Sequence, residues 1–191
     1  MTCPRIAQTI LPALAAAVLW LCVASVPASA TTLVLQSTAK LYEHADLVAV
    51  IDVQRITSIQ TRGRIVTHVE ARVSDTFKGG EVGASLKVLV AGGAVDGLAQ
   101  RVEGMPTFTE GESCLVFLRQ VAPAVYQVVA LEQGKLALQR DSAGQWIVRR
   151  SVTARMLQPS ATGGWEEAAP PETQPAEAFF ATLRRLGAGA P

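Results

Sequence analysis

The strongest constraint on the fold of this chain is a regular alternation of side chains between residues 65 and 77. Successive side chains of a β-strand point to opposite faces, so the alternation predicts a strand with one buried and one solvated face. The preceding Arg62-Gly63-Arg64 predicts a hairpin turn. The odd-numbered, mostly apolar set is Ile65, Thr67, Val69, Ala71, Val73 and Phe77, and the even-numbered polar set is His68, Glu70, Arg72 and Ser74.

Other short apolar runs are separated by glycine-containing turns. The β-branched run at residues 47–56 is too short for a buried helix and predicts a strand, after a candidate helical turn at 40–45. No segment of helical periodicity separates the runs, and closing a sheet removes its exposed edges. We therefore expect a mainly β fold, a small antiparallel barrel over residues 31–155. Further strands are predicted at residues 85–91, 98–103, 114–118, 126–131, 135–138 and 145–150.

The composition changes after residue 155. Residues 156–175 are rich in Pro, Gly, Ala and Glu and lack periodicity, which predicts a linker or loosely held loop. A short amphipathic helix is then predicted at residues 176–187, because Phe179, Leu183 and Leu186 are spaced on one helical face. A helix this short is unstable alone in water, so it must pack on the barrel or on a partner protein.

The first thirty residues have the pattern of an export signal. An apolar run at residues 10–26 is followed by Ala28 and Ala30, which form a small-x-small cleavage site. Cleavage is predicted before Thr31, and the protein is expected to be periplasmic or secreted. The alternative is an uncleaved anchor, because about 20 apolar residues can span a bilayer. A proline directly after the run favours cleavage, which would leave no stable membrane span.

Removal of this leader would change the cysteine count and the charge balance. Cys114 would be the only remaining cysteine, so no intramolecular disulfide could form. The 17 basic residues include Arg5, and without it 16 basic residues face 16 acidic residues. Nucleic acids and anionic membranes require a basic surface, so we expect neither as a partner.

The candidate catalytic and metal-binding residues are few. Cys114 with His44 or His68 is the minimum for a thiol enzyme, but a lone cysteine in an apolar strand is more often a small buried hydrophobe. His68 and Glu70 share the wet face of one strand, yet a structural zinc would need two further ligands. We therefore predict no catalytic residue, no metal site and no cofactor.

The longest irregular stretch of the predicted barrel is at residues 92–112. Its glycines are typical of tight turns, but long loops in compact domains are often functional. We interpret it as the best candidate binding loop, with an apolar tip flanked by two charged residues. The candidate binding residues are Arg101, Glu103, Met105, Pro106 and Phe108.

Short motifs of structural character are spread over residues 41–138. They are Ala45-Asp46-Leu47-Val48-Ala49-Val50, Val69-Glu70-Ala71-Arg72-Val73, Phe77-Lys78-Gly79, Ala91-Gly92-Gly93, Val102-Glu103-Gly104-Met105-Pro106-Thr107-Phe108, Gly111-Glu112, Leu115-Val116-Phe117-Leu118 and Gln133-Gly134-Lys135. Together they resemble a family of uncharacterised exported bacterial proteins. Their order is also similar to the netrin-like domain of tissue inhibitors of metalloproteinases, which implies a five-stranded OB-like barrel.

The inhibitory activity of that second family is not implied directly. Those inhibitors resemble one another in chelating the protease zinc through a disulfide-bonded N-terminal cysteine, whereas Thr31 is the predicted first residue here. Without an anchoring disulfide, residues 31–38 are expected to be mobile. The leading prediction is a non-enzymatic exported barrel that binds a protein or cell-envelope component through its loops. The alternatives are an inhibitor of an exported protease and a thiol-dependent enzyme using Cys114.

Overall fold

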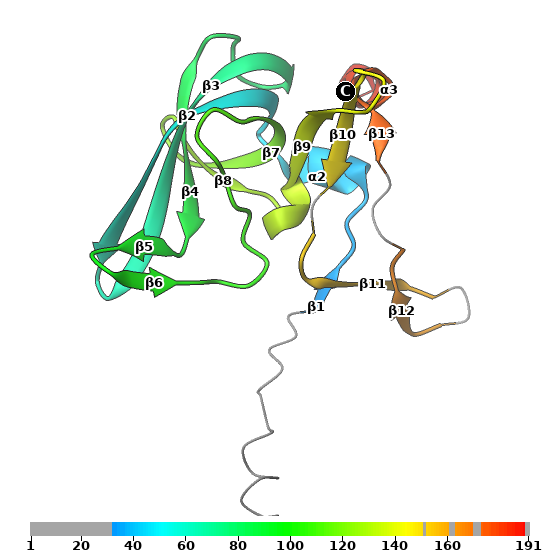
Figure 1. Ribbon diagram of the computed structural model, residues 1–191. Helices are drawn as coiled ribbons and strands as arrows, with labels where there is room; N and C mark the ends of the chain where they lie inside the picture. Colours follow the sequence, from blue (N-terminus) through cyan, green and yellow to red (C-terminus); the bar gives the residue numbers. More distant parts are fainter. Residues whose placement is uncertain (1–31, 151, 161–162, 170–172, 190–191) are drawn as a thin grey trace, which may run out of the picture. The chain divides into compact units, whose positions relative to one another are not determined.

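The computed structural model describes residues 32–150, 152–160, 163–169 and 173–189 (Figure 1). All of them belong to the second of two compact units, residues 1–30 and 31–191. The predicted leader and its cleavage residues Ala28, Ala30 and Thr31 lie outside the described residues. Among the residues described, no helix combines the length and the apolar character needed to cross a membrane.

Strands dominate the described chain, which confirms the prediction of a mainly β protein. The long strands form a continuous sheet, and shorter strands form two small sheets. In chain order the elements are β1 (Thr32–Val34), α2 (Thr38–His44), β2 (Leu47–Thr61), β3 (Arg64–Lys78), β4 (Ser85–Ala91), β5 (Gly93–Val95), β6 (Leu98–Gln100), β7 (Ser113–Ala122), β8 (Val125–Val128), the 3-10 helix η1 (Leu131–Gly134), β9 (Lys135–Arg140), β10 (Trp146–Arg150), β11 (Arg155–Pro159), β12 (Trp165–Glu167), β13 (Gln174–Pro175) and α3 (Ala176–Ala188).

Five strands of the described chain are hydrogen-bonded to one another in a closed cycle, which we call the ring (Figure 1). β2 pairs with β3 and with β7, and β3 pairs with β4. β8 closes the cycle because it pairs with both β4 and β7. Every pairing is antiparallel except that between β4 and β8. The predicted turn at Arg62-Gly63 is confirmed, since β2 ends at Thr61 and β3 begins at Arg64.

An irregularity in β2 keeps its apolar side chains on the inner face of the ring. The register of β2 on β3 shifts between Val53 and Arg55, so one extra residue is inserted there. Such a bulge reverses the alternation of side chains. Ile51 and Val53 belong to the inner core before the shift, and Ile56 packs against the same core after it.

A second core lies on the outer face of β2 and β7, which explains why both strands are apolar at successive positions. Val48 of β2 and Phe117 of β7 are fully buried there. Helix α3 covers this core with Phe179 and Leu183, which are buried. The helix therefore packs on the protein's own sheet, the first of the two outcomes expected for it. The rings of Phe77 and Phe180 are 4.9 Å apart and extend this contact.

Short strands occur at both ends of the domain, where the sequence predicted a linker and a mobile arm. The expected linker at residues 156–175 contains β12, β13 and most of β11, and the expected arm contains β1 and the start of α2. The two ends are joined, because β1 pairs with β11 in parallel across more than a hundred residues. A local sequence pattern does not reveal a partner so distant in the chain.

Candidate functional site

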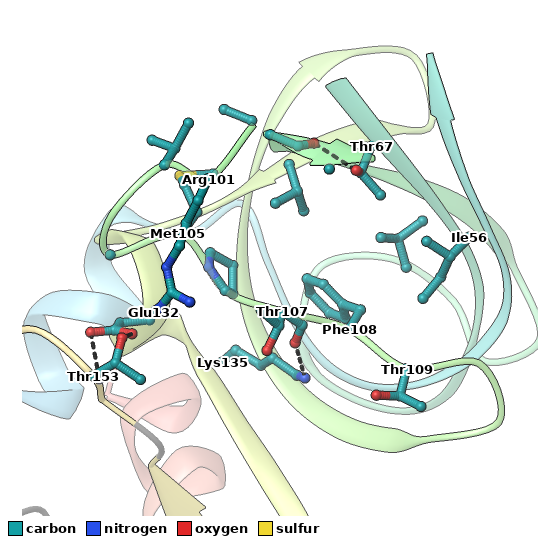
Figure 2. Close-up of a pocket in the computed structure, with 18 of the residues that line it drawn as sticks. Ile56, Thr67, Arg101, Met105, Thr107, Phe108, Thr109, Glu132, Lys135 and Thr153 are labelled. Atoms are coloured by element: carbon teal, nitrogen blue, oxygen red, sulfur yellow. Dashed lines mark hydrogen bonds between the residues drawn. The ribbon is translucent and has the colours of Figure 1, made fainter. Parts of the chain in front are cut away.

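A cleft of about 600 Å³ lies between the inner face of the ring and residues 92–112 (Figure 2). This stretch, predicted as irregular, contains the paired strands β5 and β6, and we keep the name loop for it. We call the cleft the ring cleft. Its volume is within the range of about 300–1,000 Å³ that is usual for ligand sites. Ile56, Val69 and Val90 of the ring form an apolar wall, and Met105 and Phe108 of the loop face them. The cleft lies beside the part of β2 that follows Asp52, the last residue of β2 that pairs with β7.

The structure brings the predicted loop residues together but not as an exposed tip. Pro106 is buried, and Met105 and Phe108 are half-buried because they pack against the inner core of the ring. Arg101 and Glu103 are exposed and form an ion pair with 3.2 Å between Nε and Oε1. The apolar residues therefore line the ring cleft, and of the charged pair only Arg101 reaches its rim.

Lys135, at the start of β9, fixes the loop from the far side of the cleft. Its Nζ lies 2.6 Å from Oε1 of Glu112 and also donates to the backbone carbonyl of Thr107. The same ammonium lies 4.5 Å from the centre of the Phe108 ring, a cation–π distance. Figure 2 shows Phe108 between Lys135 and Ile56. Sequence reasoning missed Lys135, because a single lysine at the start of an apolar strand has no distinctive pattern.

Glu132 in η1 provides the second anchor of the loop. Its backbone N–H donates to the carbonyl of Gly104 over 2.8 Å. Its carboxylate is buried and accepts three hydrogen bonds, from the backbone N–H groups of Thr153 and Ala154 and from the Thr153 hydroxyl. A buried charge is tolerated only when its hydrogen-bonding capacity is used, and these donors meet that need. The loop is thereby joined to the segment that follows β10.

The floor of the cleft contains a chain of hydroxyl hydrogen bonds. Thr67 Oγ1 donates to the carbonyl of Gly92 over 2.7 Å, so Ser58 Oγ, 2.9 Å away, must be the donor to Thr67. Gly93 lies directly against this chain. A Cβ atom at Gly93 would be 2.3 Å from Thr67 Oγ1 and 2.5 Å from Ser58 Oγ. Only glycine therefore allows β5 to cross the β2–β3 hairpin this closely.

Gln133, next to Glu132, holds the N-terminal strand. Its side chain accepts from the N–H of Gln36 over 2.8 Å and donates to the carbonyl of Val34 over 3.0 Å. The two bonds use both the oxygen and the nitrogen of the side-chain amide, and Gln133 is buried. The N-terminal arm is thus hydrogen-bonded to the same 3-10 helix that anchors the loop.

Cys114 does not line the ring cleft. It is fully buried in the inner core, and this burial raises the pKa of its thiol to about 12, against a smaller lowering effect of Lys135. A reactive thiol needs a lowered pKa and access, so this environment is the opposite of that of a nucleophile. His44 is exposed at the end of α2, and His68 is half-buried on β3.

The ring cleft therefore combines an apolar wall, hydroxyl groups and a fixed ammonium–carboxylate pair. Within the described ranges, no three His, Cys, Asp or Glu side chains are grouped so that they could hold a metal ion. Such a lining can bind a mixed apolar and polar ligand surface. Comparison of the chain with protein-family models and with curated proteins finds no match.

Proposed function

We propose that this protein is an exported binding module that holds a protein or cell-envelope component at the ring cleft. The observation that carries the proposal is the fixation of the loop that forms one wall of the cleft. Lys135 binds Glu112 and Thr107, and Glu132 binds Gly104. A preformed surface loses less conformational freedom when it binds, so its contacts contribute more to affinity.

Export is supported by the leader pattern, with cleavage proposed between Ala30 and Thr31. The balance of 16 basic and 16 acidic residues after removal of Arg5 supports a protein or neutral envelope partner over nucleic acid. The cleft agrees with this charge balance, because Lys135 is neutralised by Glu112 and Arg101 by Glu103.

We also propose that the ring is an OB-like barrel, as the resemblance to the netrin-like domain implies. The support is its five-strand cycle, in which β4 pairs with β8 in parallel and the other four pairings are antiparallel. OB folds are five-stranded, partly open Greek-key barrels that bind ligands between a strand face and loops. The ring cleft is such a place.

The two alternatives lack comparable support. A thiol enzyme would need an accessible thiolate, and Cys114 is buried. An inhibitor with an N-terminal wedge would need a free arm, whereas Gln133 and β11 hold residues 32–36. An inhibitor of an exported protease that used the ring cleft would be one form of the proposed binding module.

The test is a cross-linking pull-down from envelope and secreted fractions, with the protein purified after export of the full-length chain. Phe108→Ser removes the largest apolar side chain of the loop wall. Trp165→Ser removes an exposed aromatic of β12, which is 60% exposed and does not line the cleft. Arg101→Glu changes an exposed residue at the rim of the cleft. Because the side chain is exposed, this substitution is not expected to unfold the protein.

We expect a specific partner that Trp165→Ser retains and that Phe108→Ser and Arg101→Glu weaken. Thermal melting of each variant separates loss of binding from loss of fold. A partner that all three variants retain would place binding elsewhere and contradict the proposal.

A further inference from the structure

We infer that the partner contributes an extended peptide segment, which pairs as an added strand with the open edge of β2 at residues 56–60 and places an apolar side chain in the ring cleft. This inference rests on the proposed function, because it specifies how the cleft is used. In this mode, main-chain hydrogen bonds provide affinity and a pocket for alternate side chains provides specificity.

The open edge arises because β2 is longer than its neighbour. β7 pairs with β2 only from Leu47 to Asp52, although β2 continues to Thr61. In the described part of the chain, no strand pairs with β2 on that side beyond Asp52. The loop supplies one further pair of main-chain hydrogen bonds on this side of β2. The Val53 N–H donates to the Glu112 carbonyl, and the Val53 carbonyl accepts from the Gly111 N–H.

The next main-chain N–H on this edge donates to a side chain, where a neighbouring strand would otherwise accept its hydrogen bond. The N–H of Ile56 donates to Oε1 of Glu110 over 2.8 Å. Backbone groups alternate in direction along an antiparallel strand, so those of Ile56, Ser58 and Gln60 point away from β3. The other strand agrees, because Ile65 lies opposite Gln60 and its own backbone groups bond away from β2, to the Gly92 N–H and the Gln100 side chain. Ser58 and Gln60 therefore present main-chain donors and acceptors at the edge.

The side chains at this edge match an added strand. Ile56 and Ser58 point into the ring cleft, where Met105 and Phe108 supply the opposite wall. A strand paired at Ser58 would direct alternate side chains into the same space. On the other face, Ile59 is an exposed hydrophobic residue at 38% exposure. A cross-strand neighbour on the peptide would cover it.

The chemistry of the edge favours a polypeptide over other ligands. Outward main-chain N–H and C=O groups that alternate along an extended strand are matched by another main chain of the same spacing. The carboxylate of Glu110 already serves as a substitute acceptor at Ile56, which shows the kind of group that this edge takes. The expected ligand is therefore an extended segment with apolar residues at alternate positions.

The experiment compares two substitutions at one exposed position. Gln60→Pro removes an outward N–H that β3 does not use, and proline is tolerated at sheet edges of this kind. Gln60→Ala removes the same side chain but keeps the N–H. Peptides are selected from a random-sequence display library on the exported full-length protein, and binding of the selected peptides to each variant is measured.

We expect alternating apolar peptides that bind Gln60→Ala as they bind the unmodified protein and bind Gln60→Pro about tenfold more weakly. Their binding should also be lost when single peptide nitrogens are methylated at alternate positions. Equal binding by the two variants, or a selection that yields no such peptide, would overturn the inference.

A second measurement does not depend on the stability of Gln60→Pro. Amide hydrogen exchange at Ser58 and Gln60 of the unmodified protein should slow when the selected peptide is bound, and unchanged exchange would overturn strand addition. If the cross-linked partner is lost with Phe108→Ser but retained by Gln60→Pro, the proposed function stands and only the added strand is overturned. A partner that both Phe108→Ser and Arg101→Glu retain would contradict the proposed function and the added strand together.

Discussion

The ammonium of Lys135 lies 2.6 Å from a carboxylate oxygen of Glu112, with side chains that are only 13% and 24% exposed. This pair joins β9 to the loop wall of the ring cleft. Lys135→Met keeps the aliphatic stem but leaves Glu112 half-buried without its cation, which should cost about 1–3 kcal/mol of unfolding free energy. Urea denaturation measures the loss.

A matched pair on the ring surface is the control. Lys87 and Glu70 are 4.0 Å apart and are 37% and 50% exposed. Exposed ion pairs contribute about 0–1 kcal/mol, so Lys87→Met should have little effect. Equal losses for the two lysine variants would show that Lys135 does not fix the loop.

Glu132→Gln tests the second anchor of the loop. The carboxylate accepts three hydrogen bonds in a buried site, and an amide would turn its NH₂ group toward a donor. The expected loss is about 1–3 kcal/mol of unfolding free energy. Glu166→Gln, in an exposed position on β12, should change little. Similar stabilities of the two variants would contradict the role assigned to Glu132.

Cys114 predicts a specific pH dependence. Burial raises the pKa of its thiol from 9.0 to about 12, so the unfolded chain loses this proton before the folded protein does. The stabilisation is complete below pH 9.0 and is lost toward pH 12, at about 1.4 kcal/mol per pH unit.

Cys114→Ala removes this dependence. Its deficit in unfolding free energy relative to the unmodified protein should shrink as the pH rises above 9.0, as measured by urea denaturation over a pH series. Two parallel curves would show that the thiol ionises equally in both states.

Gly79 and Gly63 separate the effect of backbone conformation from that of space. Both have a positive φ, 62° and 77°, but a Cβ at Gly79 would be 2.3 Å from the carbonyl oxygen of Asp46, whereas Gly63 is open. Gly63→Ala should cost about 1–2 kcal/mol from the left-handed conformation alone. Gly79→Ala should cost clearly more, and thermal denaturation that ranks them in the reverse order would contradict the close approach of residue 79 to Asp46.

The sequence was sufficient for elements whose signal is local. The alternation at residues 65–77 corresponds to β3, and the spacing of Phe179 and Leu183 corresponds to α3. The strand β11 could not be predicted in the same way, because its partner β1 lies at the other end of the domain.

The candidate site was predictable only in part. Loop length and apolar character indicate Met105, Pro106 and Phe108 as candidates, but the inward orientation of Met105 and Phe108 depends on the inner core against which they pack. Lys135 and Glu132 have no distinctive sequence pattern. Their roles depend on their hydrogen-bond partners Glu112 and Thr153, which are more than twenty residues away in the sequence. The open edge of β2 likewise follows from a difference in strand length between β2 and β7, which only the pairing reveals.

The most direct test of the ring cleft as the binding surface is amide hydrogen exchange on the exported protein, alone and with the partner captured by cross-linking. We expect slower exchange at Ser58 and Gln60 and across the loop at residues 105–112. Protection confined to α3 or to the β1–β11–β12 sheet, with the cleft unchanged, would contradict this expectation.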